Sequence, residues 1–600
     1  MNYHRDWYVK DGAEKHKKEL YQTPQGDWRL TTQEKKRILL NNIHGVDIDA
    51  QAVEVTKLSL LLKVLEGESD ETLKRQLSFV KERALPDLGQ NIKCGNSLIG
   101  TDYFTGKMFP DEEEMRRINP FDWQAGFPEI VKAGGFDAVI GNPPYVRIQV
   151  MKEWAPVEVE AYKSLYESAS KGNYDIYVVF VERGLSLLNK NGRLGFILPH
   201  KFFQTQYGEP LRKLISKGKH LAAVVHFGDQ QVFEGATTYT CLLFLDKGGS
   251  ESCRFKRVED LGAWQTTGRA IEGSIPVKNV TSAEWNFTVG AGASLFEKLK
   301  RMTIQLGDVA DVFVGLQTSA DDVFILDLVR EQDRVLALKS KVLNKVVVLE
   351  RDLLYPLISG TDVARYSPLP ERQYILFPYR VQDESAELLT FERITKECFK
   401  TATYLLKTKK RLEQREGGKF KGSAWYRFGR NQNVGIQARV KLCVPRLVER
   451  LHATYDIQGN HFLDNVDVGG ITLKDEYSVQ GLQYLLGLLN SKLLCWFFPQ
   501  ISVPFRGGWY SANRQFLSKL PIRLIDFSDK SEIVEHDKIV SFVERMLDLH
   551  KRLAATKNPN DQTRLQSQID ATDREIDRLV YDLYGLTDDE IAIVEGSAKT

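Results

Sequence analysis

An apolar run that stops at two consecutive prolines constrains the fold of this chain more than any other feature. Residues 138–140 predict a buried strand, which breaks at Gly141 into the sequence Asn-Pro-Pro-Tyr. Because proline fixes φ and has no backbone N–H, this strand end is rigid and leaves carbonyl groups facing outward. An amide, a free carbonyl and an aromatic ring held together suit a flat substrate that carries an exocyclic amine. An ordinary proline turn is the alternative for these four residues, Asn142, Pro143, Pro144 and Tyr145.

The length and composition of the chain limit the classes of protein to which it can belong. With 600 residues, of which 42% are hydrophobic and 27% charged, it predicts a globular protein of about two to four domains. No run of about 18 apolar residues occurs and the N-terminus has no apolar leader, so we expect a cytoplasmic protein without a membrane partner. The six cysteines include no C-x-x-C pair, which predicts reduced thiols and no metal site.

Strand-like and helix-like segments alternate over the first part of the chain. A strand over residues 43–48 precedes a long amphipathic helix, and a second helix is predicted over residues 175–188. This alternation predicts an α/β domain over residues 1–250 with a mostly parallel sheet. The other predicted strands cover residues 136–140, 195–198, 222–227 and 241–245.

The rest of the chain divides into three segments of different composition. Residues 251–299 are predicted to be a connecting segment between two domains. Residues 300–525 combine short mixed strands with aromatic and basic clusters. Residues 530–600 carry apolar residues at helical spacing, which predicts two helices separated by a turn at 558–560. Gly585 is a candidate C-terminal cap for the second of these helices.

Two motifs upstream of the proline pair also follow predicted strands. Asp47 ends a strand, and an acid at such a position commonly holds the ribose hydroxyls of a nucleotide-like cofactor. Asp49 is expected to cap the helix that follows, and capping alone is the alternative for this acidic pair. Residues 94–98 place the polar pair Asn96 and Ser97 after another short strand, where they suit the edge of a purine or form a plain turn.

The order of these three motifs resembles that of the amino-methyltransferases that use S-adenosylmethionine. The closest likeness is to the adenine-N6 DNA methyltransferases of restriction–modification systems, and within them to type IIG-like enzymes with a TaqI-like C-terminal specificity domain. The catalytic motif is the specific part of this resemblance, which covers nearly the whole chain. Softer support comes from three blocks in the second half, residues 314–318, 356–362 and 488–492.

The resemblance implies a fold and an activity. The expected fold is a Rossmann-like methyltransferase sheet, incomplete at its N-terminus, followed by a mixed α+β DNA-specificity domain and C-terminal helices. Residues 1–250 would form the methyltransferase domain and residues 300–525 the target-recognition domain. The expected reaction is site-specific transfer of a methyl group from S-adenosylmethionine to N6 of adenine in double-stranded DNA, within a restriction–modification or phage-defence system.

The resemblance also implies roles for individual residues on the side of the methyl acceptor. The target adenine would be flipped out of the duplex. The Asn142 side-chain oxygen and the Pro143 carbonyl would accept the two N6 hydrogens, with Pro144 completing the catalytic motif. Tyr145 would stack on the adenine. Phe233 fits a second aromatic ring on the other face of the base, with a core side chain as the alternative.

On the side of the methyl donor, the resemblance implies four contacts and shows one departure. Asp47 would bind the cofactor ribose, Ile48 would pack on its adenine, and Asn96 and Ser97 would contact the adenine edge. The family carries a glycine-rich loop before the ribose-binding acid, yet the residues before Asp47 contain no G-x-G. We therefore expect an N-terminally truncated product that binds the cofactor poorly and lacks an N-terminal portion or a nuclease partner.

Two segments are candidates for holding DNA. Residues 407–433 contain nine Lys or Arg and two acids, a net charge of +7, interleaved with aromatic residues. The cations assigned to DNA there are Lys409, Lys410, Arg411, Lys419, Lys421, Arg427 and Arg430. A solvated charged face is the alternative. In residues 505–514 a Gly-Gly loop precedes side chains suited to base edges, with a tight turn as the alternative; these side chains are Arg506, Asn513 and Arg514.

Two rival functions are compatible with the same motifs. A protein-glutamine or RNA-guanine methyltransferase also uses Asn-Pro-Pro-Tyr on a planar amide or amine, but a basic C-terminal half of 300 residues disfavours these compact enzymes. A non-catalytic, truncated DNA-binding remnant is the other rival, because the expected cofactor loop is missing.

Overall fold

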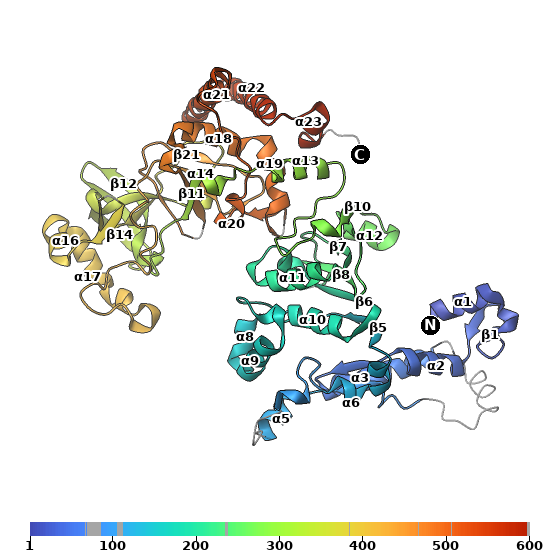
Figure 1. Ribbon diagram of the computed structural model, residues 1–600. Coiled ribbons are helices and arrows are strands. Elements are labelled where there is room, and N and C mark those ends of the chain that lie inside the picture. The colour runs from blue at the N-terminus through green and yellow to red at the C-terminus, as the bar shows by residue number, and fades with distance from the viewer. Residues whose placement is uncertain are drawn as a thin grey trace. The chain divides into compact units, whose positions relative to one another are not determined.

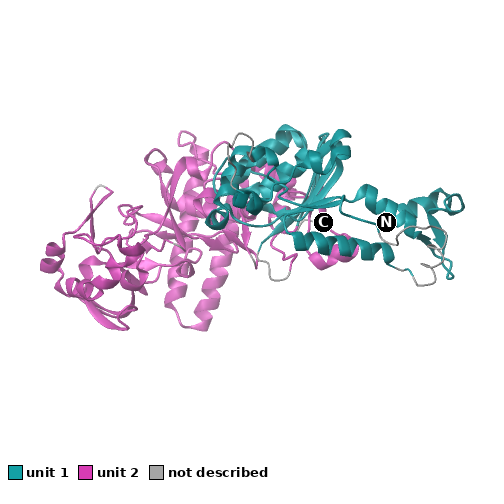
Figure 2. Cartoon of the chain, turned by 90° about the horizontal axis from the view of Figure 1, so that it is seen from below, with its two compact units in different colours: residues 1–226, 235–256, 274–285 teal, residues 227–234, 257–273, 286–600 magenta. Residues whose placement is uncertain are grey.

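The computed structural model describes residues 1–66, 68, 86–104, 112–233, 238–382, 384–465, 467–505 and 507–596. The chain forms two compact units (Figure 2). Unit 1 comprises residues 1–226, 235–256 and 274–285, and unit 2 comprises residues 227–234, 257–273 and 286–600. The units are therefore interleaved along the sequence, and the division of the chain into domains at residues 250 and 300 stays a proposal.

Within the described residues, none of the helices combines the length and the apolar character needed to span a membrane.

Unit 1 carries the first part of the α/β pattern that the sequence predicts (Figure 1). Its helices are α1 (Asn2–Gly12), α2 (Thr32–Asn42), α3 (Ala50–Leu65), α5 (Glu112–Ile118), α6 (Trp123–Gly126), α7 (Pro128–Lys132), α8 (Ile148–Trp154), α9 (Pro156–Leu165), α10 (Tyr177–Leu187) and α11 (Glu209–Lys217). The first ten strands are β1 (Leu20–Gln22), β2 (Trp28–Leu30), β3 (Gly45–Asp47), β4 (Ile92–Cys94), β5 (Phe136–Gly141), β6 (Leu188–Pro199), β7 (Leu221–His226), β8 (Thr240–Asp246), β9 (Ser252–Arg257) and β10 (Ile271–Pro276).

A six-stranded sheet with the order β10-β9-β7-β8-β6-β5 forms the centre of this α/β region. Strand β5 runs parallel to β6, whereas β8 pairs antiparallel with both β6 and β7. The predicted mostly parallel sheet is therefore corrected to a mixed sheet. The reason is that the described residues between β7 and β8 form no helix, and consecutive strands without a crossover helix can pair antiparallel.

Strands β3 and β4 form a separate parallel pair, with Asp47 opposite Cys94. Helix α3 begins directly after β3, because the Asp49 carboxylate accepts a hydrogen bond from the Gln51 backbone N–H at 2.8 Å. The expected capping role of Asp49 is confirmed. Among the described residues β3 and β4 pair only with each other, and β5 pairs only with β6.

Unit 2 contains most of the second half of the chain. Its helices are α12 (Leu261–Thr267), α13 (Ala293–Lys300), α14 (Leu306–Val309), α15 (Asp321–Phe324), α16 (Phe391–Glu397), α17 (Phe399–Glu413), α18 (Leu482–Asn490), α19 (Lys492–Ile501), α20 (Arg514–Leu517), α21 (Lys530–Ala555), α22 (Pro559–Leu583) and α23 (Asp588–Val594). Its strands form a four-stranded sheet of the order β11-β23-β19-β21, a six-stranded sheet of the order β14-β13-β12-β16-β15-β22, a hairpin β17-β18 and a three-stranded sheet β20-β25-β24.

The bounds of these strands are β11 (Ala310–Val314), β12 (Ile325–Gln332), β13 (Val335–Ser340), β14 (Lys345–Glu350), β15 (Leu354–Ile358), β16 (Gln373–Leu376), β17 (Tyr379–Gln382), β18 (Ser385–Leu388), β19 (Lys441–Pro445), β20 (Leu447–Val448), β21 (Thr454–Asp456), β22 (Phe462–Leu463), β23 (Val468–Leu473), β24 (Pro504–Phe505) and β25 (Trp509–Ser511).

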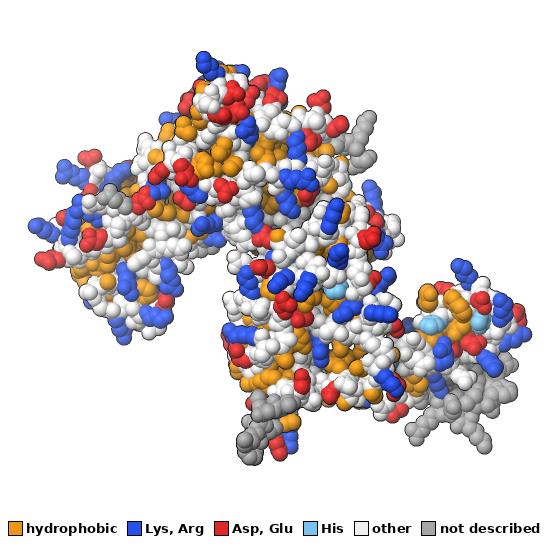
Figure 3. All heavy atoms as spheres, viewed as in Figure 1, with side chains coloured by type: hydrophobic (Ala, Val, Ile, Leu, Met, Phe, Trp, Pro, Cys, Tyr) orange, Lys and Arg blue, Asp and Glu red, His pale blue; other side chains and the backbone are white. Residues whose placement is uncertain are grey.

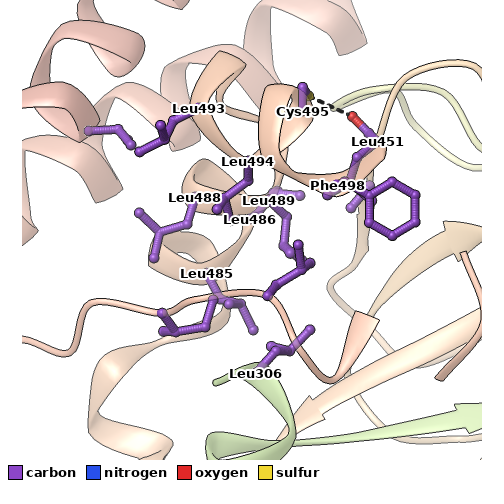
Figure 4. Packing of buried hydrophobic residues seen from close by; sticks show 14 of the residues in the cluster. Leu306, Leu451, Leu485, Leu486, Leu488, Leu489, Leu493, Leu494, Cys495 and Phe498 are labelled. Atoms are coloured by element: carbon purple, nitrogen blue, oxygen red, sulfur yellow. Dashed lines mark hydrogen bonds between the residues drawn. The ribbon is translucent and has the colours of Figure 1, made fainter. Parts of the chain in front are cut away.

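The largest core of unit 2 lies where α18 and α19 meet the four-stranded sheet and the C-terminal helices. Leucines of α18 and α19 fill it almost without exposure, and the Cys495 thiol donates a hydrogen bond to the Leu451 carbonyl at 3.0 Å (Figure 4). Asn490 is also buried there, where its side chain bonds both the N–H and the carbonyl of Ala453, at 2.8 and 3.1 Å. The block at residues 488–492 is therefore structural at this position, since it joins α18 to the sheet.

The two predicted C-terminal helices are confirmed as α21 and α22, which pack against each other. Asn558 caps α22 by accepting a hydrogen bond from the Asn560 backbone N–H at 3.0 Å, and Pro559 occupies the first helical position. Gly585 follows the helix with φ of +58°, a conformation that glycine adopts without a steric penalty.

Candidate active site

The Asn-Pro-Pro-Tyr segment leaves the carboxyl end of β5 and is fixed by hydrogen bonds on both sides. The Tyr145 hydroxyl donates to the Asn142 side-chain oxygen at 2.8 Å and lies 3.3 Å from the Ile197 carbonyl in the neighbouring strand β6. The residues that follow are tied to the start of α10 by backbone bonds from Ile148 to Tyr174 and from residue 176 back to residue 146, both 2.9 Å. The segment is thus a rigid platform at a strand end.

The Tyr145 phenol is protonated at neutral pH, so its hydroxyl group is a hydrogen-bond donor. Burial is the main cause that raises the pKa of Tyr145 to about 12, with a smaller contribution from the nearby Cys241. The amide oxygen of Asn142 has two lone pairs, and the tyrosine hydroxyl takes one of them. Because Asn142 is exposed, its second lone pair and its amide group are accessible from solvent.

The four residues predicted to bind the cofactor meet at the carboxyl ends of β3 and β4. The Gly95 backbone N–H donates to the Asp47 carbonyl at 2.8 Å, which places the turn after β4 beside the end of β3. Asp47 and Ile48 are exposed, and 56% of the Ile48 surface is accessible. Asn96 is buried and Ser97 is half-buried in that turn. The sequence-predicted residues of this group therefore lie together.

The chemistry of these residues fits the adenosine end of S-adenosylmethionine. The exposed carboxylate of Asp47 is able to accept hydrogen bonds from a ribose diol, and the exposed side chain of Ile48 offers an apolar surface for a purine. The Asn96 side-chain oxygen accepts a hydrogen bond from the Leu98 backbone N–H at 3.0 Å, so its amide group is held in one orientation. The described residues supply no glycine-rich loop for the methionine end.

Strand β5 and helix α3 are among the elements of unit 1 that expose apolar side chains. Ile140 in β5 is 85% accessible, although a strand of a parallel pair is ordinarily covered on both faces. On α3, the side chains of Val55, Leu58 and Leu62 are 57 to 63% accessible. The prediction that residues 138–140 form a strand is confirmed, but the expectation that this strand is buried is wrong, because Ala138 and Ile140 are exposed and Val139 is half-buried.

Phe233 lies in residues 227–234, which belong to unit 2. Its side chain is 36% accessible, so the alternative of a core side chain is wrong. The segment is anchored through Gln230, whose amide donates to the Val258 carbonyl at 2.8 Å and whose oxygen accepts from the Leu261 backbone N–H at 2.6 Å. The role of Phe233 in stacking on a displaced base stays a proposal.

The basic segment 407–433 separates its cations from its aromatic rings. The rings are buried in the core of the six-stranded sheet or beside it, namely Phe420, Trp425, Tyr426 and Phe428. The expectation that these aromatics contribute to a DNA surface is therefore wrong, because their area is needed to cover the sheet. The predicted cations Lys410, Arg411, Lys419, Lys421, Arg427 and Arg430 are exposed, and Lys409 is half-buried.

Several of these cations are partly neutralised by acids. Arg411 forms a two-pronged pair with Asp322, and Arg430 contacts Glu416 at 3.0 Å. Lys409 lies 3.8 Å from Glu413 and Lys419 lies 4.0 Å from Glu416. Lys and Arg side chains share the surface over α16 and α17 with acidic ones (Figure 3). Of the predicted cations in this segment, Lys410, Lys421 and Arg427 have no acidic partner within the described part of the chain, so they carry the free positive charge.

Arg415 organises this segment and was missed by the sequence prediction. It is buried and donates to three backbone carbonyls, those of Leu412, Thr318 and Trp425, at 2.8 to 2.9 Å. Its guanidinium lies 4.0 Å from the centre of the Phe420 ring. Burial lowers the pKa of Arg415 to about 10, which still leaves it charged at neutral pH. The sequence signal that could have indicated its burial is the glycine pair at 417 and 418, where the chain turns with positive φ.

The second DNA candidate is the hairpin formed by β24 and β25. Asn513 accepts two hydrogen bonds from the Arg446 guanidinium, at 2.9 and 2.7 Å, so it is engaged with the scaffold. Arg514 is exposed at the start of α20. Arg506 lies outside the described residues. Among the described residues, no group of three or more His, Cys, Asp or Glu side chains is placed to hold a metal ion, and all six cysteines are free.

Comparison with protein families assigns both halves of the chain. Residues 41–233 match the Eco57I restriction-modification methylase family, and residues 355–522 match the TaqI-like C-terminal specificity domain. The chain is thus similar to restriction-modification methylases over residues 41–233 and to their TaqI-like specificity domain over residues 355–522. The predicted family resemblance and the α/β fold class with a specificity domain are thereby confirmed, since both matches fall in the order that the sequence predicts, whereas the expected N-terminal truncation stays a prediction.

Two curated relatives and one solved structure are similar to this chain. The type II restriction enzyme and methyltransferase RM.Eco57I of Escherichia coli is 28% identical over 99% of the chain, and the chain spans 59% of its length. The type II methyltransferase M.PaeR7I of Pseudomonas aeruginosa is 24% identical over 69% of the chain and 68% of its own length. The type IIL restriction-modification enzyme MmeI, solved in complex with DNA, shares the fold with a TM-score of 0.52 at 14% identity, covering 94% of the chain and 75% of MmeI.

Proposed function

We propose that the chain transfers a methyl group from S-adenosylmethionine to N6 of adenine in duplex DNA. The observation that carries the proposal is the rigid strand end at Asn142 and Tyr145, joined by a hydrogen bond of 2.8 Å at the carboxyl end of β5. The family match over residues 41–233 supports methyl transfer, and the match over residues 355–522 supports a DNA target. We assign the methyltransferase domain to residues 1–250 and the target-recognition domain to residues 300–525.

The hydrogen-bond acceptors and the aromatic ring of the platform suit an exocyclic amine on a flat base. The free lone pair of the Asn142 amide oxygen and the carbonyl of Pro143 accept the two hydrogens of N6, which concentrates electron density on the nitrogen. The ring of Tyr145 stacks on the base, and its hydroxyl holds the Asn142 side chain in place. Bound S-adenosylmethionine supplies an electrophilic methyl group on its sulfonium. The protein needs no side-chain base, because N6 loses a proton to water only after it has gained the methyl group.

The donor side of the site follows from the β3–β4 pair. We assign Asp47 to the ribose hydroxyls, Ile48 to one face of the cofactor adenine, and Asn96 and Ser97 to the edge of that adenine. Isothermal titration calorimetry with S-adenosylmethionine tests this assignment without catalysis. We expect Asp47→Ala to weaken binding and Asp27→Ala, which removes an exposed acid elsewhere in unit 1, to leave it unchanged. Equal affinities for both variants would remove Asp47 from the site.

Methyl transfer itself distinguishes the proposed function from its rivals. The purified chain is incubated with S-adenosylmethionine labelled in the methyl group and with plasmid DNA that lacks adenine methylation. Nucleosides from digested DNA are then separated, and label in N6-methyladenine is the expected result. Label in protein or RNA alone would favour the glutamine or guanine methyltransferases. A shifted DNA band on a gel without any label would favour a non-catalytic DNA-binding protein.

Variants of the platform test the roles within the reaction. Asn142→Ala is expected to lower the rate about 100-fold or more, the usual effect of removing one preorganised hydrogen-bonding group from an active site. Asn191→Ala, which removes an exposed amide near the start of β6, is the matched control. Tyr145→Phe keeps the ring and loses the bond to Asn142, so it should retain more activity than Tyr145→Ala. The reverse order would contradict stacking by Tyr145.

A further inference from the structure

The three-stranded sheet β20-β25-β24 exposes three apolar side chains on one face. Phe505 lies directly opposite Trp509, and Leu447 lies opposite Ser511. Opposed residues in an antiparallel pair project to the same face, as do residues two apart in one strand, so all three side chains share a face. Their accessible fractions are 49% for Leu447, 42% for Phe505 and 40% for Trp509. We call Phe505, Trp509 and Leu447 the hairpin face.

The strands behind the hairpin face are fixed to the core of unit 2. The Ser502 hydroxyl donates to the Ser511 carbonyl at 2.7 Å, and the Ala512 backbone N–H donates to the Arg446 carbonyl at 2.8 Å. The turn contains Gly507 and Gly508 with φ of +84° and +79°, backbone angles that residues other than glycine rarely adopt. The two aromatic rings are therefore presented by a preorganised hairpin.

The turn of this hairpin contacts the segment that carries Phe233. The Gly508 backbone N–H donates to the Asp229 carboxylate at 3.3 Å. Gln230 of that segment is hydrogen-bonded to residues 258 and 261. The Phe227 ring packs edge-on against Trp264, with 5.2 Å between the ring centres. All of these residues belong to unit 2. The turn behind the hairpin face is thus hydrogen-bonded to the segment that carries Phe233, the residue assigned to the displaced adenine.

We propose that the hairpin face is a wedge, in which Trp509 and Phe505 enter the DNA duplex and stack on the bases that the extruded adenine leaves behind. This inference rests on the proposed function, because it assumes a DNA substrate with a displaced base. Aromatic side chains stack on bases of any sequence, and apolar wedges between base steps compensate for lost base stacking. The glycine turn lets the backbone approach a groove closely, and the exposed Arg514 follows the hairpin at the start of α20.

A protein partner fits the hairpin face less well than DNA. A stable protein interface buries about 800 Å² on each partner and uses about 20 to 30 residues a side. The hairpin face offers three apolar side chains on strands of two or three residues, which suffices for a stacked base step. Its turn is hydrogen-bonded to Asp229, in the segment that carries Phe233, the residue assigned to the displaced base, so we assign DNA as its occupant.

The test compares binding to an intact duplex with binding to the same duplex carrying one abasic site. An abasic site removes the cost of opening the stack, so the full chain should bind it about tenfold more tightly, the scale of one base–aromatic stack. Trp509→Ala should lose this preference while its affinity for the intact duplex stays within about twofold of the unchanged chain. Trp509→Phe should restore most of the preference. The control is Trp7→Ala, which removes a tryptophan with 51% of its surface exposed in unit 1.

The outcomes separate the wedge from the proposed function. If the full chain binds both duplexes and Trp509→Ala keeps the preference for the abasic site, the wedge is wrong and the proposed function stands. If the full chain binds neither duplex, both are wrong. Circular dichroism of each variant identifies a folding defect, and in that case the ratio between Trp509→Phe and the unchanged chain decides, because phenylalanine keeps an aromatic ring in the hairpin.

Discussion

Asp577 shows how a single buried carboxylate makes the stability of unit 2 depend on pH. Burial raises the pKa of Asp577 from its ordinary 3.8 to about 6, with the nearby carboxylate of Asp573 adding to the shift. The opposing influences are the Lys492 backbone N–H, which donates at 2.8 Å, and the Lys492 ammonium at 3.7 Å. One Asp577 oxygen has no hydrogen-bond partner among the described residues.

We therefore predict that Asp577→Asn stabilises the protein at pH 8 and has little effect at pH 4. The folded state binds the proton more tightly than the unfolded state, so this contribution is fully present below pH 3.8 and is lost as the pH rises through 6. The difference between 3.8 and about 6 corresponds to about 3 kcal/mol at most. Urea denaturation midpoints at both pH values measure it, and an equal gain at pH 4 and pH 8 would contradict it.

The free lysines of the basic segment carry a second prediction. Lys410 and Lys421 are exposed and have no acidic partner within the described residues, whereas Arg430 is paired with Glu416. Each lysine that contacts a phosphate contributes about 0.9 to the slope of log affinity against log salt. We expect Lys410→Ala and Lys421→Ala each to lower that slope by about this amount. Lys557→Ala, in the turn before α22, is the control, and an equal loss there would argue for a general charge effect.

At the scale of elements, the packing of α18 on α21 depends on a glycine. A Cβ atom at Gly487 would lie 3.0 Å from side-chain carbons of both Ile539 and Val543, which are fully buried. We predict that Gly487→Val destabilises the protein by about 1 to 3 kcal/mol, because overpacking forces the two helices apart. Gly262→Val in the exposed α12 is the control. Thermal unfolding of both variants measures the difference, and equal midpoints would show that the helices shift without cost.

The outer edge of β5 makes a further prediction. Strand β8 pairs on both sides, whereas β5 pairs only with β6 within the described residues. We expect backbone amides of β5 that face away from β6 to exchange with deuterium faster than those of β8, since unpaired amides meet water. Exchange measured by mass spectrometry on peptides covering 136–141 and 240–246 tests this. Equal protection of both strands would show that another segment pairs with β5 in solution.

The sequence predicts local elements better than it predicts their partners. The strands at residues 222–227 and 241–245 are confirmed within one residue at each end as β7 and β8. Their antiparallel pairing was not foreseen, because period-2 alternation fixes a strand but not its neighbour. Likewise, the sequence of residues 420–428 does not distinguish aromatic rings that face DNA from rings that pack in the core. The burial of Arg415, which folds that segment, follows from three distant carbonyls and from no local pattern.

For the molecule as a whole, the interleaving of the two units determines which pieces can fold alone. The chain passes between the units five times, at the boundaries after residues 226, 234, 256, 273 and 285. Residues 286–600 alone lack the segments 227–234 and 257–273, and with them the contact between Gly508 and Asp229.

We predict that a fragment of residues 286–600 melts at a lower temperature than the corresponding transition of the full chain. The physical reason is the loss of packing against residues 227–234 and 257–273 of the same unit. Differential scanning calorimetry of the fragment and of a fragment that starts at residue 227 measures this effect. Equal melting temperatures of the two fragments would show that the inserted segments add no stability to unit 2.

The exposed edge of β5 also affects how the protein behaves in a concentrated solution. A strand edge that pairs with no other strand of the described residues, and that carries an accessible isoleucine, is a template onto which the same edge of another copy can add. Association of this kind grows with concentration and gives open-ended chains when the contact does not close on itself. Light scattering during concentration would reveal it, and a lysine in place of Ile140 would suppress it by placing a charge on the edge.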